Sequence, residues 1–365
     1  MHRSADPIEA VSQRLGRFVG TQRSSWAEAG PEARLFLDAA ARTLEGGKRL
    51  RARFCVTGWR AVAGIDDDGE DAPVEPHSVL DAAAALEIFH AAALVHDDII
   101  DNSDTRRGQP AAHRALATAH ARSGWAGDAD GFGRSAAVLL GDLLVAWSDD
   151  LLEQGLRHTD HAASAREVYA LMRRDVTVGQ FLDIAEEAAF TTAPDAEHAE
   201  RALRVASLKS ARYSIQHPLL IGAALAGADD AQRAALAAFG HPVGLAFQLR
   251  DDVLGVFGDS AVTGKPSGDD LREGKRTLLI AYARERLDAA TRQSMDALIG
   301  DPGLDDAQIA GLQQTITDTG ALERVEAAIA GYAAEADRAL VDAPLAATAV
   351  RDLRQLAEAS IIRSA

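Results

Sequence analysis

The sequence predicts an all-α fold, and three observations predict it. The 365 residues are 47% hydrophobic but only 5% aromatic, so alanine, leucine and valine supply most of the core, as suits close-packed helices. Apolar residues recur at helical spacing along the chain, and no stretch reads as a convincing strand. No linker is long enough to separate domains. We therefore expect one domain, residues 1–365, folded as a large helical bundle around a central cavity.

The first half of the chain carries clear helix starts and stops. A helix is expected over residues 6–18, and Pro31 starts a second one that ends at Gly46-Gly47. Lys48 is expected to open a third helix, with Lys48 and Arg51 on one face of its first turn. A polar, acidic loop broken by two prolines follows at residues 64–77. It leads into the central helix, residues 78–101.

The second half is also expected to be helical. Kinks are expected at Pro218 and Pro242, because proline lacks the backbone N–H that a helix needs. Lys275 is expected to start a helix after a polar loop, and amphipathic helices fill the last ninety or so residues. The other expected helices cover residues 135–156, 166–189, 199–226 and 231–256.

Charge limits the classes of ligand. The formal net charge is −17, so non-specific binding to nucleic acid or anionic lipid is excluded as a main function. An anionic substrate would need positive charge concentrated at its site. Only four of the 38 basic residues are lysine, and all lie in segments with other signs of function. They are Lys48, Lys209, Lys265 and Lys275.

The compartment expected from the sequence is the cytoplasm. Cys55 is the single cysteine, so no intrachain disulfide can form and a reducing compartment fits. The first residues lack the apolar run of a signal peptide. No window reaches 18 uninterrupted apolar residues, so no integral membrane segment is expected.

The end of the central helix carries the strongest chemical signal. His90, Asp97 and Asp101 lie on one helical stripe. Carboxylates four residues apart repel each other, and Mg²⁺ can bridge such carboxylates to substrate phosphates. Arg106 and Arg107 follow, and guanidinium groups bind phosphate oxygens in pairs. Taken alone, the acidic motif is equally compatible with a solvated helix end, and His90 with an ordinary buried histidine.

A second acidic segment, Asp251-Asp252, ends another apolar helix about 150 residues later. Two such helices facing each other across a bundle would direct carboxylates at a common volume, as in other helical metal sites. That volume suits Mg²⁺ ions and two diphosphates. Gln180 and Asp183 either line the same cavity or only satisfy helix contacts.

These motifs resemble those of trans-isoprenyl diphosphate synthases of the polyprenyl synthetase family, most closely bacterial geranylgeranyl diphosphate synthases. The resemblance implies the isoprenoid synthase fold and spans residues 46–277 in family order. Its matching segments are GGKRLR (46–51), FHAAALVHDDIIDNSDTRRG (89–108), GDLL (141–144), GQFLD (179–183), Lys209-Ser210, GLAFQLRDD (244–252), GKP (264–266) and GKRT (274–277).

The resemblance implies a Mg²⁺-dependent prenyltransferase that condenses isopentenyl diphosphate with an allylic diphosphate, with three Mg²⁺ ions per active site and a homodimer as the expected assembly. Five aspartates are implied as the metal site, with Asp98 in a supporting role: Asp97, Asp98, Asp101, Asp251 and Asp252. The allylic diphosphate would contact Arg106, Lys209 and Lys265. Isopentenyl diphosphate would contact Lys48, Arg51, His90 and Arg107.

Three further residues complete the implied site. Gln248 and the Ser210 hydroxyl would face the developing carbocation, and Lys275 would also contact substrate. Serine stands where the family usually has threonine. Gly255 departs from the family pattern, because many relatives have a third aspartate there. If that aspartate acts through water, Asp251 and Asp252 suffice; if not, affinity for the third Mg²⁺ is reduced.

Product length can be argued from the central helix. Ala93 and Ala92 precede Asp97 by four and five residues, and farnesyl-forming relatives typically have an aromatic side chain at the second position. The first bulky side chain is Phe89, roughly 12 Å below Asp97 at 1.5 Å per residue. We therefore expect a C20 product, geranylgeranyl diphosphate, with longer chains as the alternative. The two alanines also fit close helix packing alone.

Two rival functions differ in their motifs. A class I terpene cyclase would need a second motif of the Asn/Asp-x-x-Ser/Thr-x-x-x-Glu type, whereas this chain has DDxxG followed by GKP. A non-catalytic subunit of a hetero-oligomeric synthase would have lost aspartates or cationic ligands, and this chain keeps nearly all of them. We therefore expect no cyclase, and the non-catalytic subunit stays as an alternative to the active synthase.

Overall fold

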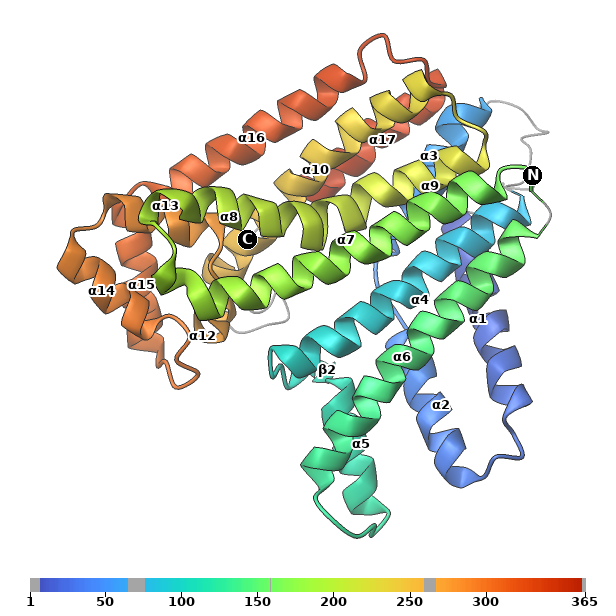
Figure 1. Ribbon diagram of the computed structural model, residues 1–365, viewed down its shortest axis with the longest axis horizontal. Helices are drawn as coiled ribbons and strands as arrows, with labels where there is room; N and C mark the ends of the chain where they lie inside the picture. Colours follow the sequence, from blue (N-terminus) through green and yellow to red (C-terminus); the bar gives the residue numbers. More distant parts are fainter. Residues whose placement is uncertain (1–6, 65–75, 158, 259–266, 363–365) are drawn as a thin grey trace. The chain divides into compact units, whose positions relative to one another are not determined.

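The computed structural model describes residues 7–64, 76–157, 159–258 and 267–362. These residues are helical apart from turns, connecting segments and one hairpin whose two strands have two residues each (Figure 1). This confirms the all-α prediction. The chain divides into two compact units. We call residues 1–165 with 221–227 the N-terminal unit, and residues 166–220 with 228–365 the C-terminal unit.

The core of the N-terminal unit is α4 (His77–Ile100), which packs against α1, α3 and α6 and lies alongside α6 (Figure 1). Glycines on α6 allow this approach: a Cβ at Gly141 would lie 2.2 Å from the His96 ring of α4. The bounds in this unit are α1 (Pro7–Ser25), α2 (Pro31–Thr43), α3 (Leu50–Ala63), β1 (Thr105–Arg106), β2 (Gln109–Pro110), α5 (Ala112–Arg122) and α6 (Ala129–Leu156).

Helix α4 is apolar because it is a core helix. By length and composition it could cross a membrane, but 78% of its most apolar window is buried inside the fold. Four consecutive alanines, residues 82–85, are each at most 1% exposed. Their small side chains let neighbouring backbones approach α4 closely.

The C-terminal unit is built around α10 (Asp230–Phe257), which packs against η3, α16 and α17. A Cβ at Gly244 would lie 2.5 Å from the backbone of Ala211 in η3, so this glycine sets the helix approach. Two helices belong to both units along the chain: α7 (Ala162–Ala189) begins in the N-terminal unit, and α9 (His217–Leu225) ends in it. The other bounds of the C-terminal unit are η1 (Phe190–Thr192), η2 (Asp195–Glu197), α8 (His198–Val205), η3 (Ala206–Gln216), α12 (Asp269–Glu273), α13 (Leu278–Arg286), α14 (Ala289–Leu298), α15 (Asp306–Asp318), α16 (Ala321–Ala339) and α17 (Ala347–Ile361).

The structure differs from the expected elements in several places, three of which concern the connections between helices. The segment 199–226 is not one kinked helix, because η3 is a π-helix between α8 and α9. The RRG segment forms the β1–β2 hairpin, where no strand was expected. Helix α12 divides the polar loop expected after residue 258.

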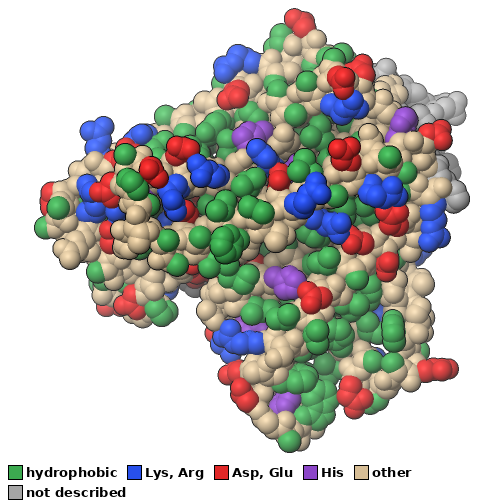
Figure 2. Space-filling view, viewed as in Figure 1, with side chains coloured by type: hydrophobic (Ala, Val, Ile, Leu, Met, Phe, Trp, Pro, Cys, Tyr) green, Lys and Arg blue, Asp and Glu red, His purple; other side chains and the backbone are tan. Residues whose placement is uncertain are grey.

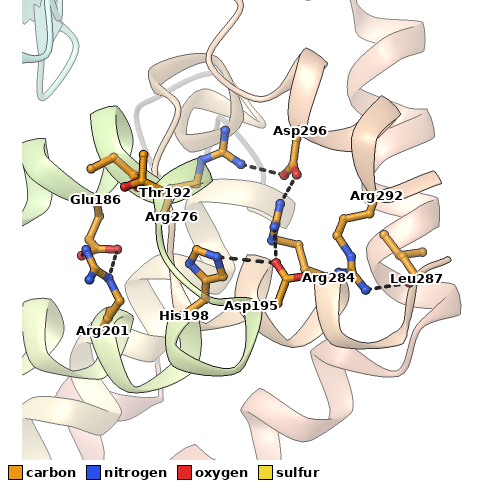
Figure 3. A network of polar contacts seen from close by, with 11 residues as sticks. Glu186, Thr192, Asp195, His198, Arg201, Arg276, Arg284, Leu287, Arg292 and Asp296 are labelled. Atoms are coloured by element: carbon orange, nitrogen blue, oxygen red, sulfur yellow. Dashed lines mark hydrogen bonds and ion pairs between the residues drawn. The ribbon is translucent and has the colours of Figure 1, made fainter. Parts of the chain in front are cut away.

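A polar network in the C-terminal unit holds Arg276 of the GKRT motif and the helix that follows it, α13 (Figure 3). Asp296 of α14 accepts hydrogen bonds from both Arg276, at 3.1 Å, and Arg284 of α13. The Arg276 guanidinium also lies 3.4 Å from the centroid of the Phe190 ring. Burial lowers the pKa of Arg276 to about 10. Asp296 therefore compensates two largely buried cations.

Replacing Asp296 with asparagine is expected to lower the free energy of unfolding by about 3 kcal/mol, because the buried guanidinium groups of Arg276 and Arg284 both lose a carboxylate partner, Arg284 keeping Asp195. Urea unfolding followed by circular dichroism measures this. Asp306→Asn is the matched control, since Asp306 is fully exposed and lies 3.8 Å from Arg272, and it is expected to leave stability unchanged. Equal stabilities of the two variants would contradict the assignment.

Candidate active site

The carboxyl end of α4 places three carboxylates together. Asp97 and Asp98 lie in its last turn and Asp101 is its C-cap, where the Asp101 N–H donates to the Asp97 carbonyl at 2.8 Å. The last turn contains no basic residue. Negative charge at the carboxyl end of a helix is unfavourable, because that end already carries partial negative charge. This arrangement favours a bound cation.

Asp98 is held by Arg106. Its side chain is 3% exposed and accepts a hydrogen bond from Arg106 Nε at 2.9 Å. The same guanidinium lies 3.6 Å from Asp97 Oδ2. Asp97 and Asp101 are only partly buried, so they can accept an ion while Asp98 holds Arg106. This geometry fits the supporting role expected for Asp98.

The β1–β2 hairpin determines where the two arginines point. Arg107 and Gly108 form its turn with φ values of 53° and 71°, and positive φ at both central residues is typical of a type I′ turn. The Arg107 guanidinium would lie 3.1 Å from a Cβ at Gly47, whose φ is 86°. Its Nη1 donates to the Glu45 carbonyl at 3.3 Å. The GG and RRG motifs therefore contact each other.

Four arginines of the N-terminal unit act on His90 through their charge. Burial first, and then their positive charges, hold the pKa of His90 well below its ordinary value, so His90 is neutral at neutral pH. In order of their effect they are Arg51, Arg107, Arg106 and Arg49. The sequence predicted all of these except Arg49. A diphosphate is the kind of ligand that such a cluster of cations binds.

The start of α3 corrects the position expected for Lys48. The helix begins at Leu50 with Arg49 as its N-cap at φ 51°, so Lys48 lies in the preceding turn and shares no helical face with Arg51. Buried Glu87 of α4 accepts a hydrogen bond from the Ala52 N–H at 3.0 Å and lies 3.6 Å from Arg49. The sequence reasoning missed Glu87; its signal is a lone acidic residue inside an apolar helix.

In the C-terminal unit, Lys209 of η3 pairs with Asp183 of α7. A Cβ at Gly179 would lie 2.3 Å from the Lys209 backbone nitrogen, so this glycine lets the two helices touch. The Ser210 side chain is buried beside it. The π-helix is rare in proteins and is frequently found at functional sites. The sequence left open whether Asp183 lines the cavity or only satisfies helix contacts. In the structure it is a partner of Lys209.

The second acidic segment lies near the carboxyl end of α10. Asp251 is exposed, whereas Asp252 is buried and accepts a hydrogen bond from Gln248 Nε2 at 2.7 Å. Burial, and then the charge of Asp270, raise the pKa of Asp252 well above its ordinary value. Asp251 is therefore the accessible ligand, and Asp252 holds Gln248.

The remaining predicted residues are Lys275, Lys265 and the three residues of α4 that are expected to set product length. Lys275 does not start a helix, since α13 begins at Leu278; its ammonium pairs with Glu273 at 2.6 Å and Asp270 at 3.4 Å. Lys265 lies outside the described residues. Phe89 and Ala92 are buried and Ala93 is partly buried, as expected for either a tunnel lining or close helix packing.

The donor set fits Mg²⁺. Among the described residues, no three His, Cys, Asp or Glu side chains are already arranged as a metal ligand set. The available donors at both acidic segments are carboxylate oxygens, which hard divalent cations prefer, and Mg²⁺ commonly takes one or two of them together with phosphate oxygens. Asp97, Asp101 and Asp251 would hold the ions, which would offset the negative charge of a diphosphate.

The fold is all-α, and each unit has one acidic segment and cationic side chains suited to metal–diphosphate binding. The sequence profile described as Polyprenyl synthetase matches residues 34–316. The chain belongs to the polyprenyl synthetase family, and it is a prenyltransferase of that family.

Relatives of known name match most of the chain. Geranylgeranyl diphosphate synthase of Mycobacterium tuberculosis is 34% identical over 294 residues, 80% of this chain and 71% of the relative. Geranylfarnesyl diphosphate synthase of Aeropyrum pernix is 32% identical over 315 residues, 85% of this chain and 88% of the relative. The crystal structure of geranylgeranyl pyrophosphate synthase from Corynebacterium glutamicum, complexed with isoprenyl diphosphate and magnesium, is 37% identical with a TM-score of 0.89 over 100% of both chains.

Proposed function

We propose that this protein condenses isopentenyl diphosphate with an allylic diphosphate, requires three Mg²⁺ ions, and stops at the C20 product, geranylgeranyl diphosphate. One observation carries the proposal. In the N-terminal unit, the acidic end of α4 lies in the same unit as the arginines whose charges act on His90. Relatives named as geranylgeranyl diphosphate synthases support the chain length. A geranylfarnesyl diphosphate synthase at 32% identity makes C25 the alternative.

The chemistry follows from charge. Breaking the allylic C–O bond leaves a delocalised carbocation and a diphosphate; bound Mg²⁺ supplies Lewis acidity that stabilises the leaving group. Arg106 and Lys209 add fixed positive charge, held in place by Asp98 and Asp183, so little reorganisation is needed during the reaction. The cluster around His90 holds isopentenyl diphosphate, and Gln248 and Ser210 face the cation. Positioning both substrates makes the coupling effectively unimolecular.

Incubation with Mg²⁺, isopentenyl diphosphate and farnesyl diphosphate tests the proposal. After phosphatase treatment, chromatography should show geranylgeraniol as the main product, with none formed in excess chelator. A cyclic hydrocarbon would assign the protein to the terpene cyclases, and no turnover would assign it to non-catalytic subunits. A C25 alcohol as the main product would overturn the chain length alone.

Replacing Ala92 with phenylalanine is expected to shorten the product to C15, because the ring would fill the groove about one and a half turns below Asp97. The measurement is the product distribution with dimethylallyl diphosphate as primer. Ala92→Ser, which keeps the small size, should leave the distribution unchanged. A folded Phe variant with an unchanged C20 product would show that Ala92 serves only in packing.

We also propose a homodimer with α7 at the interface. Three apolar side chains, Leu171, Val178 and Phe181, share one face of α7 and are exposed in the single chain, Phe181 at 66%. Figure 2 shows hydrophobic side chains gathered over the middle of this helix. A second copy of the chain is the proposed occupant, because an apolar stripe of this kind suits a self-complementary contact.

Replacing Phe181 with glutamate is expected to convert the dimer to monomer in light scattering coupled to gel filtration, because a charge would be buried at the contact. Val341→Glu is the control: Val341 is similarly exposed, at 58%, but lies beyond the end of α16. A Phe181 variant with the same mass as the control would contradict this interface.

A further inference from the structure

A cavity of about 260 Å³ lies in the C-terminal unit and is lined by residues of η3, α10 and α16. Of the catalytic and substrate-binding residues that the structure describes, none lines this cavity. Its volume is below the usual range of pockets for drug-sized ligands, so it suits a smaller molecule. The lining residues decide the chemistry of that molecule.

Two hydrogen-bond acceptors of the lining lack a donor. Gln216 of η3 lines the cavity, and its Oε1 atom is buried without a hydrogen-bond partner among the described residues. Pro242 lies inside α10 and has no N–H, so the Ala238 carbonyl lacks the donor that the residue four positions later supplies in an α-helix. A buried acceptor without a partner costs free energy. Both acceptors therefore favour a ligand that donates hydrogen bonds.

The charged lining residues have opposite signs. Arg212 of η3 is 41% exposed and donates to Asp175 through Nη1 at 3.1 Å, and a guanidinium has five N–H donors, so it can also bind a ligand. Glu335 of α16 is exposed. Burial and Arg212 lower the pKa of the lining residue His241, whereas Glu335 raises it, so both charges act on one neutral histidine. A ligand with one charge would be repelled by one of these residues, whereas a zwitterion has a partner for each of its charges.

We propose that this cavity binds a small zwitterion, an α-amino acid with an apolar side chain. The ligand carboxylate would accept two parallel hydrogen bonds from the Arg212 guanidinium. Its ammonium group has three N–H donors, and the lining offers three acceptors. Ala237 and Pro242 provide apolar surface for the ligand side chain. The three acceptors are the Glu335 carboxylate, Gln216 Oε1 and the Ala238 carbonyl.

Saturation-transfer difference NMR with L-leucine and the full chain tests this proposal. L-Leucine should show saturable binding with a Kd of about 1 mM, which is reasonable for a ligand of this size. Two analogues, 4-methylpentanoate without the ammonium group and 3-methylbutylamine without the carboxylate, should each bind about tenfold more weakly, because each leaves one charge of the cavity unmatched. An analogue that binds as tightly as L-leucine would contradict the proposed zwitterion.

Two substitutions locate the site. Glu335→Gln and Arg212→Met should each weaken L-leucine binding by about tenfold, because each removes a charged partner. Glu323→Gln is the matched control, since Glu323 is another exposed carboxylate of α16 and does not line the cavity. It should bind L-leucine as the wild-type protein does.

Thermal unfolding shows whether each variant folds. Arg212→Met also loses the pair with Asp175, whereas Glu335 is exposed, so Glu335→Gln remains a valid test if Arg212→Met is unstable. Glu335→Gln that binds L-leucine as tightly as Glu323→Gln, or a wild-type protein without saturable binding, would overturn the amino-acid site. Neither result would affect the proposed prenyl transfer, which uses other residues.

Discussion

Replacing Asp97 with asparagine is expected to lower kcat by about 10³-fold while leaving the fold intact. Loss of a metal-binding carboxylate removes several kcal/mol of transition-state stabilisation, and about 4 kcal/mol corresponds to this factor. Unfolding cannot be the cause, because removing negative charge from the carboxyl end of α4 favours the helix. Steady-state kinetics with thermal unfolding separates the two effects.

The control for Asp97 is Asp104→Asn. Asp104 is an exposed aspartate of the same segment, and its carboxylate pairs with Arg114 at 2.6 Å, outside the proposed metal site. Its substitution should change kcat less than twofold. If Asp97→Asn kept a third or more of wild-type kcat, the first acidic segment would not hold the metal.

Replacing Arg106 with methionine is expected to have two large effects. The free energy of unfolding should fall by about 3 kcal/mol, because the Asp98 carboxylate, whose side chain is 3% exposed, loses its buried partner. Activity, measured as kcat/KM for the allylic diphosphate, should fall about 10³-fold, because a fixed cation no longer meets the diphosphate. Urea unfolding and steady-state kinetics measure the two losses.

The double variant Arg106→Met with Asp98→Asn separates stability from catalysis. Removing the uncompensated carboxylate should recover most of the lost stability, since the two residues form one coupled pair. Activity should stay low, because the cation is still missing. Recovery of both quantities together would show that Arg106 serves only to neutralise Asp98.

The helices could be predicted where a periodic apolar face and a clear start coincide. Helix α2 begins at Pro31 as expected, and the end of α4 lies one residue from its expected position. The start of α3 could not be predicted, because Arg49 adopts a left-handed conformation that side chains other than glycine rarely take. The π-helix η3 is also invisible to sequence patterns, since it depends on packing against α7 and α10 through Gly179 and Gly244.

The candidate site could be predicted where its residues lie in short motifs. The charges of Arg51, Arg106 and Arg107 all act on the neutral His90, so these motif residues lie in one region of the N-terminal unit. The groups that position these side chains were harder to find, because their contacts join segments far apart in the chain. Glu87 contacts α3 thirty-five residues away, and the Asp270 side chain of α12 lies against Gly255 of α10.

The most direct test of the central claim is a crystal structure with Mg²⁺ and an unreactive thiolo analogue of an allylic diphosphate. We expect Mg²⁺ ions that join the diphosphate to Asp97 and Asp101 on one side and to Asp251 on the other. A diphosphate bound without contact to these carboxylates through Mg²⁺, or Asp97 and Asp251 lying on opposite sides of the molecule, would contradict the account.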